Sequence, residues 1–162
     1  MARKRALLVR QARDSDRAAL DALWRSVDEL HAELLPGYFR RARSPARPDS
    51  FVEEALDSRD QTLLVAEIGG EVIGLVHVEI YDTPPLPVMV PRRRAHIEDI
   101  VVEKRQQREG VGRRLMEEAA RWAREQGATQ VVLTVWRGNE AARKFYESLG
   151  YKEVSRVLEW DL

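Results

Sequence analysis

The chain has 162 residues, which predicts a single domain, residues 1–162, that can bury a sizeable core without a metal or a disulfide. It contains no cysteine, which excludes a disulfide framework, a thiolate zinc site and a cysteine nucleophile. Lys and Arg together number 27, as do Asp and Glu, so the net charge is zero and gives no indication of a nucleic-acid partner.

We also expect no targeting segment and no membrane partner. The apolar run that follows Arg3-Lys4-Arg5 ends at Arg10, which is too short for the hydrophobic region of a signal peptide. No stretch approaches the length needed to span a bilayer. The sequence therefore predicts a cytoplasmic protein.

The first third of the chain predicts one strand and two helices. Residues 7–9 form a short strand, and a long helix begins at Asp14 or Ser15 and ends before Pro36-Gly37. Its apolar positions recur at spacings of three and four: Leu20, Leu23, Trp24, Val27, Leu30 and Leu34. Ser50-x-x-Glu53 predicts a capping box on a short second helix. The loop between the helices is basic (Arg40, Arg41, Arg43 and Arg47), either as a solvated loop or as a rim for an anionic group.

The rest of the chain predicts five strands and two helices. Strands 62–68 and 71–81 form a hairpin around Gly69-Gly70, and the four prolines of residues 82–91 predict a stiff loop. A central strand at 97–102 precedes an amphipathic helix that ends at Gly127 and has a stripe of Val111, Leu115, Ala119, Trp122 and Ala123. A strand at 130–136, a helix at 140–149 capped by Asn139, and a last strand at 151–160 complete the order. This order predicts a mixed α/β sheet with helices on both faces.

The loop between the central strand and the amphipathic helix suits an anion. It ends in Gly110-x-Gly112, where free backbone amides, the helix dipole and the absence of side chains favour a negative group. A dinucleotide fingerprint would need a glycine where Leu115 stands, and a P-loop would need Lys-Ser or Lys-Thr where Arg113-Arg114 stands. Both of these classes are excluded, and an ordinary turn remains as the structural alternative.

Three segments together resemble one family. Gln107-x-x-Gly110-x-Gly112 resembles the acyl-CoA loop of the GCN5-related N-acetyltransferases, the GNAT family. Residues 139–151, with Asn139, Phe145-Tyr146-Glu147 and Gly150-Tyr151, resemble the second signature of that family, and residues 65–74 resemble its central hairpin. The resemblance implies a GNAT-like mixed, mostly antiparallel sheet with helices on both faces.

The resemblance also implies that acetyl-CoA is the cosubstrate and that its acetyl group passes to a primary amine. The pyrophosphate would lie on the loop formed by Gln107, Arg108, Glu109, Gly110, Val111 and Gly112. Arg105 and Arg113 are further candidate phosphate partners, with an ordinary surface charge as the alternative. The pantetheine arm would run along Ile100, Val101 and Val102. Asn139 is a candidate cofactor contact, although its role as a helix cap alone would explain it.

For catalysis, Tyr146 matches the family's general-acid position, and Glu98 is the candidate base. Strand alternation predicts that Glu98 and Asp99 lie on opposite faces, and Asp99 or a water chain remains an alternative base. An ion pair with an arginine, such as one of Arg92–Arg94, would instead give Glu98 a structural role. The histidines are isolated in the sequence, so we expect no metal site, although His77 or His96 could take part in a proton path.

Other functions and partners remain open in the sequence. A non-catalytic acyl-CoA-binding or sensing module on the same fold is one alternative, and an anion-binding protein without CoA is another. The acceptor amine, a small molecule or a peptide, is not identified by the sequence. An exposed last strand could support a homodimer by edge pairing.

Overall fold

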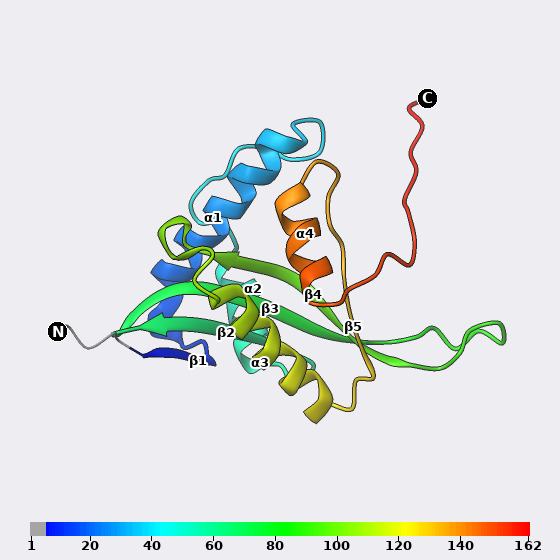
Figure 1. The fold of residues 1–162 in the computed structure, drawn as a ribbon, viewed down its shortest axis with the longest axis horizontal. Coiled ribbons are helices and arrows are strands. Elements are labelled where there is room, and N and C mark those ends of the chain that lie inside the picture. The colour runs from blue at the N-terminus through cyan, green and yellow to red at the C-terminus, as the bar shows by residue number, and fades with distance from the viewer. Residues whose placement is uncertain (1–5) are drawn as a thin grey trace.

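The computed structural model describes residues 6–162, and its centre is one five-stranded sheet in the order β1-β2-β3-β4-β5 (Figure 1). The strands are β1 (Leu7–Gln11), β2 (Gln61–Ile68), β3 (Glu71–Asp82), β4 (Arg93–Val102) and β5 (Gln130–Leu133). Neighbouring strands are antiparallel from β1 to β4, whereas β5 runs parallel to β4. The predicted mixed, mostly antiparallel sheet is confirmed.

Helices cover both faces of this sheet. The short turn η1 (Asp14–Asp16) leads into α1 (Arg17–Leu34), which packs on one face with α2 (Asp49–Asp57). The turn η2 (Lys104–Gln106) precedes α3 (Val111–Glu125), which packs on the other face with α4 (Glu140–Ser148). Each face therefore has its own hydrophobic cluster, because β3 and β4 direct alternate side chains to opposite sides.

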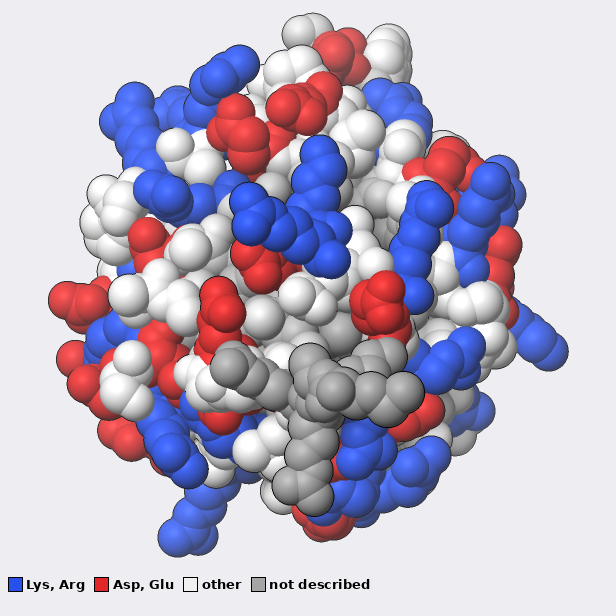
Figure 2. Space-filling model, turned by 60° about the vertical axis from the view of Figure 1, so that its left-hand side comes forward, with Lys and Arg blue, Asp and Glu red and all other residues white. Residues whose placement is uncertain are grey.

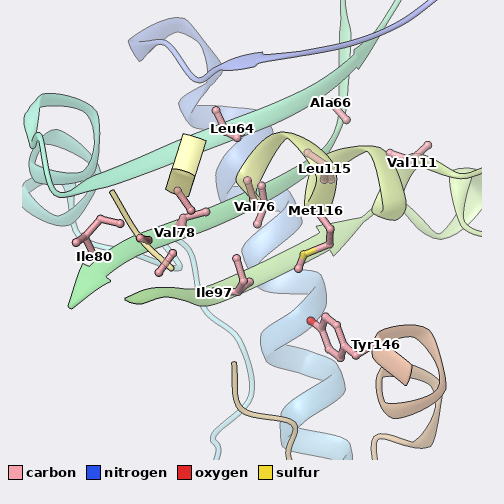
Figure 3. Close-up of a cluster of buried hydrophobic side chains, with 14 of the residues drawn as sticks. Leu64, Ala66, Val76, Val78, Ile80, Ile97, Val111, Leu115, Met116 and Tyr146 are labelled. Atoms are coloured by element: carbon pink, nitrogen blue, oxygen red, sulfur yellow. The ribbon is translucent and has the colours of Figure 1, made fainter. Parts of the chain in front are cut away.

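The cluster under α3 connects the core to the candidate site. Leu115 and Ala119 are fully buried against Val76 and Val78 of β3, and Tyr146 of α4 joins the same cluster (Figure 3). Most of the predicted helical stripe is buried as expected, with Trp122 only partly buried. Burial of a large aliphatic side chain stabilises a fold by about 1.5–3 kcal/mol, so this cluster fixes α3 firmly on the sheet.

One local prediction is confirmed and one is wrong. Gly69 and Gly70 have φ values of 62° and 90°, as a tight hairpin requires. The predicted capping box of Ser50 and Glu53 is not formed, because α2 begins at Asp49, before Ser50, and has no side-chain cap. The α1 segment opens with a 3₁₀ turn, in which the Asp16 carboxylate accepts a hydrogen bond from the Arg13 amide at 2.8 Å.

The C-terminal prediction is also wrong. Residues 151–160 form no strand, and β5 ends at Leu133 instead of residue 136. After α4 the chain runs on in an extended, irregular path to the C-terminus, which stands away from the sheet (Figure 1). A strand needs a partner edge for its hydrogen bonds, and this segment has none within the described part of the chain.

Charge is mixed on the surface shown in Figure 2, where acidic and basic side chains lie among one another and among uncharged residues. Many of the charges neutralise each other along one helix, for example Arg114 with Glu118 and Arg121 with Glu125 on α3. Within residues 6–162, no helix combines the length and the apolar character that crossing a membrane requires.

Candidate active site

The N-terminus of α3 is built to accept an anion. Gly110 is the residue before the helix and has φ 83°, a left-handed conformation that favours glycine. In the described chain, the amides of Val111, Gly112 and Arg113 donate no hydrogen bond, and no side chain caps this end. A Cβ atom placed on Gly110 would meet nothing within 4 Å, so the space beside these amides is open. Such an end attracts negative groups through its amides and its dipole.

Gln107 fixes the loop that leads to this helix end. Its side-chain amide donates a hydrogen bond of 3.0 Å to the carbonyl oxygen of Val102, the last residue of β4. Arg105, Arg108 and Arg113 are exposed and form no ion pair with any described residue. Three cations near the loop therefore remain available to a bound phosphate group.

The second half of β4 has a free edge. The pairing of β4 with β5 ends where Ile97 meets Leu133, so no strand among residues 6–162 lies beside residues 98–102 on that side. Alternate backbone N–H and C=O groups of this stretch point toward the open edge, where an extended ligand can bind them as a further strand would. Ile100 and Val102 pack toward α3, whereas Val101 packs in the cluster under α1.

A β-bulge in β4 changes the direction of the two acidic side chains. Asp99 pairs with His77 and Ile97 pairs with Val78, so Glu98 is an extra residue without a partner on β3. Because of this insertion, Glu98 and Asp99 both lie on the α1 side of the sheet. The predicted placement on opposite faces is therefore wrong, and the reason is the bulge.

Glu98 belongs to a polar cluster at this face. Its carboxylate accepts a hydrogen bond from His96 Nδ1 at 2.8 Å, and the Tyr81 hydroxyl lies 3.3 Å from it and 2.8 Å from Glu79. The bond from His96 lowers the pKa of Glu98, and the same bond raises the pKa of His96. Because its pKa is lowered, the carboxylate of Glu98 is ionised at neutral pH. Its side chain is 33% exposed, so it can be reached from solvent.

Asp99 is engaged in a different way. Its carboxylate accepts a hydrogen bond from Trp24 Nε1 at 3.1 Å and lies 3.6 Å from Arg47. The Arg47 guanidinium also binds both oxygens of Asp28 and lies 5.4 Å from the centre of the Trp24 ring. An ion pair with an arginine, which the sequence offered for Glu98, is thus formed by Asp99 with Arg47. The sequence gives no signal for this cluster, because its members come from three distant segments.

Helix α4 supplies Tyr146. Asn139 caps the helix by accepting a hydrogen bond from the Ala142 amide at 3.1 Å, as predicted. Tyr146 is only 9% exposed, and its hydroxyl makes no hydrogen bond with the part of the chain that the structure describes. Burial, followed by the neighbouring Tyr151 and then by the negative charge of Asp99, raises the pKa of Tyr146. The phenol therefore keeps its proton at neutral pH.

The neighbouring Phe145 joins α4 to the glycine loop. Its ring would lie 3.2 Å from a Cβ atom placed on Gly112, and the Val102 side chain lies 3.8 Å from the same point. The free amides of α3, the end of β4 and the second half of α4 consequently meet at one place. Gly112 allows this approach because it has no side chain.

Tyr146 and Glu98 approach the open edge of β4 from different sides. Tyr146 packs with the α3 cluster, whereas Glu98 lies on the α1 side with His96 and Tyr81. A reacting group at this edge can thus have a proton donor on one side and a carboxylate on the other. Among residues 6–162, no group of three or more metal-ligating side chains lies close enough together to hold a metal ion.

Known proteins with the same architecture were found by sequence and by structure. An uncharacterized N-acetyltransferase of Bacillus subtilis, YhfO, is 29% identical over 145 residues, which are 90% of this chain and 89% of that protein. An N-alpha-acetyltransferase of Sulfurisphaera tokodaii is 31% identical over 66% of each chain. A crystal structure of a mutant BH1408 protein from Bacillus halodurans has a TM-score of 0.90 at 25% identity, covering 96% of this chain and 99% of that one.

The fold is also that of a solved aminoglycoside N-acetyltransferase, AAC(6')-Iy in complex with CoA, with a TM-score of 0.73 at 17% identity over 96% of this chain and 98% of that one. The family model described as the acetyltransferase (GNAT) family matches residues 24–151. This match spans most of the chain and includes both the glycine loop and α4. The chain belongs to the GNAT family of acetyltransferases.

Proposed function

We propose that the protein is an N-acetyltransferase that moves the acetyl group of acetyl-CoA to a primary amine by direct attack in a ternary complex. Acetyl-CoA is the cosubstrate, as the family implies. The observation that carries the proposal is the continuous path from the open edge of β4, residues 98–102, to the unpaired amides at the N-terminus of α3. An extended thiol ester with a diphosphate at one end matches such a path.

The chain's backbone supplies most of the binding. The amides of Val111, Gly112 and Arg113 would hold the diphosphate, and Arg105 and Arg108 would neutralise its charge. Ile100, Val101 and Val102 would bind the pantetheine arm through their backbone groups. A backbone N–H of this edge would also stabilise the negative charge that develops on the thioester oxygen, an interaction typically worth about 10²–10³ in rate.

Glu98 is the proposed base, because Asp99 already accepts a hydrogen bond from Trp24 and faces Arg47. A lysine-like amine has a pKa near 10.4, so only about 0.04% is uncharged at pH 7, and a nearby carboxylate can take its proton. His96 and Tyr81 both contact the same oxygen of Glu98, Oε1, and the side chain is partly open to solvent. His96, bound to the same carboxylate, offers the proton an onward route.

Tyr146 is the proposed acid. A thiol has a pKa of about 8.5, so the departing thiolate gains from a donor that is protonated at neutral pH. The raised pKa of Tyr146 and its unengaged hydroxyl support this role. Glu98 and Tyr146 then act on opposite sides of the thioester, one on the incoming amine and one on the leaving sulfur.

The acceptor is proposed to be a small molecule or peptide with a free amine. We place the acceptor where residues that follow α1 meet residues that follow β5. There the ring centre of Trp136 lies 5.7 Å from that of Tyr38 and 4.9 Å from that of Phe39. Relatives named as an N-alpha-acetyltransferase and as aminoglycoside N-acetyltransferases fit both acceptor classes.

The test combines calorimetry with thiol release on a panel of α-amines, polyamines, lysine peptides and aminoglycosides. We expect acetyl-CoA to bind and at least one amine to support turnover. Tyr146→Phe should bind acetyl-CoA normally and lose about 10²-fold or more in kcat. Binding without turnover on any amine would indicate a sensing module instead, and a failure to bind CoA would refute the proposal altogether.

A further inference from the structure

The arginines of the loop between α1 and α2 fall into two groups in the structure. Arg47 binds Asp28 with hydrogen bonds of 2.7 and 3.0 Å, and Arg41 also pairs with an acid of α1. Arg40 and Arg43 are exposed and form no ion pair with any other described residue. The first group fastens the loop to α1, whereas the second leaves its guanidinium groups available to a ligand.

Aromatic contacts bring a further arginine to the same place. The rings of Tyr38 and Phe39 contact the ring of Trp136. Arg40 directly follows the first two rings in the sequence, and Arg137 directly follows the third. Consecutive Cα atoms are only about 3.8 Å apart, so the backbones of both arginines lie beside this contact. Arg137 is also exposed and has no ion-pair partner in the part of the chain that the structure describes.

The backbone holds this aromatic cluster in place. The amides of Tyr38 and Phe39 donate hydrogen bonds of 2.9 and 3.0 Å to the Leu35 carbonyl. On the other segment, the Asn139 amide donates a hydrogen bond of 3.1 Å to the Trp136 carbonyl. Tyr38 is 51% exposed and Trp136 is 37% exposed, so part of each ring is open to a ligand. A surface that is formed in advance lowers the entropy cost of binding.

This surface adjoins the proposed active site. The ring of Phe39 lies against that of His31 on α1, with centres 5.0 Å apart. Burial lowers the pKa of His31, and the negative charge of Asp99 opposes this shift, which places Asp99 near the ring. Asp99 directly follows Glu98, the proposed base. An acceptor whose amine reaches Glu98 can therefore extend past His31 to the exposed rings and arginines.

We propose that this surface, the basic rim, selects an acceptor peptide in which acidic side chains follow the reacting amine. The rim consists of Tyr38, Arg40, Trp136 and Arg137. The inference rests on the proposed function, because it names the acceptor of the same site. Tyr, Trp and Arg are the residue types enriched where proteins bind other chains, and a guanidinium matches a carboxylate with two parallel hydrogen bonds. The rings then cover the peptide while the arginines bind its carboxylates.

The experiment measures thiol release with two peptides that differ only in charge. Both have a free N-terminus and one lysine, and the residues that follow each amine are glutamates in one peptide and glutamines in the other. Mass spectrometry of the product identifies which amine is acetylated. We expect kcat/KM to be about tenfold higher for the acidic peptide. This preference should shrink as the ionic strength is raised, because salt screens exposed charges.

Variants of the rim test which residues carry the preference. Arg40→Gln and Arg137→Gln together should raise the KM for the acidic peptide about fivefold or more. We expect kcat, the KM for the neutral peptide and the KM for acetyl-CoA to stay near their wild-type values. Arg124→Gln is the matched control, because it removes an exposed cation at the end of α3 that is far from the glycine loop.

Equal activity on the two peptides would overturn the proposal, as would an acidic preference that survives the loss of both arginines. A higher KM for acetyl-CoA in the double variant would overturn it too, because the arginines would then serve the cosubstrate. If other amines are acetylated but neither peptide is, the rim proposal fails and the proposed function stands. If no amine is acetylated at all, both fail.

Discussion

Replacement of Glu98 by glutamine separates its chemistry from its structural contacts. The glutamine oxygen can still accept the hydrogen bond from His96 at 2.8 Å and face Tyr81 at 3.3 Å, and the side chain is partly exposed. We therefore expect the free energy of unfolding to change by no more than about 0.5 kcal/mol. What is lost is the ability to take a proton, which is worth about 10²–10⁴ in rate.

The size of the loss should depend on the acceptor. About 0.04% of a lysine-like amine is uncharged at pH 7, whereas roughly a tenth or more of an α-amine is. Glu98→Gln should therefore lower kcat/KM toward the upper end of that range for the first acceptor class and toward the lower end for the second. At 1.36 kcal/mol per factor of ten, the range corresponds to about 2.7–5.4 kcal/mol of transition-state stabilisation.

The assay is thiol release at saturating acetyl-CoA, with kcat/KM measured from pH 6 to 10 for one acceptor of each class. Glu79→Gln is the matched control, since Glu79 contacts the same Tyr81 hydroxyl but is not the proposed base. The reasoning would be refuted if Glu98→Gln stayed within threefold of wild type on the high-pKa amine. It would be refuted equally if Asp99→Asn showed the larger loss in kcat with an unchanged KM.

The remaining predictions concern stability and titration. Because the bond to Glu98 raises the pKa of His96, this pair stabilises the fold below the ordinary histidine pKa of 6.5 and the stabilisation is lost as the pH rises through the raised pKa. Because the pKa of Glu98 is lowered, the same pair also stabilises the fold above pH 4.5, the ordinary glutamate pKa, and this stabilisation is lost as the pH falls through the lowered pKa. NMR titration of Glu98→Gln should give His96 a lower pKa than it has in the wild type. Asn139→Ala removes the cap of α4 and should lower the free energy of unfolding by about 1 kcal/mol in urea denaturation, and an unchanged midpoint would show that the cap contributes nothing. Leu115→Ala should cost about 2–5 kcal/mol in the same assay and leave kcat per folded molecule near that of wild type, whereas a large fall in kcat would mean that this core position also shapes the site.

The features predicted correctly depend on short stretches of sequence. The Gly69-Gly70 turn, the buried stripe of α3 and the Asn139 cap each follow from residues within a few positions of one another. The open N-terminus of α3 after the glycine loop could also be predicted locally, because free amides at the start of a helix follow from the helix backbone itself. The order of elements through α4 then follows from these local patterns.

The features that were missed depend on contacts between distant segments. The bulge at Glu98 is set by the pairing of β4 with β3 and has no signal in residues 97–102. The hydrogen bond from Trp24 to Asp99 joins residues 75 positions apart, and the arginine considered as a partner of Glu98 lies beside Asp99 instead. The last strand was predicted at residues 151–160, but among the described residues no strand lies beside this segment to share its hydrogen bonds.

The central claim is that the backbone amides at the N-terminus of α3 bind the diphosphate of coenzyme A. The most direct measurement is a titration of the ¹⁵N-labelled protein with coenzyme A, followed by amide chemical shifts. The account predicts that the amides of Val111, Gly112 and Arg113 shift most among the residues of α3, with further shifts along residues 98–102. Saturable binding that leaves these amides unmoved would contradict it.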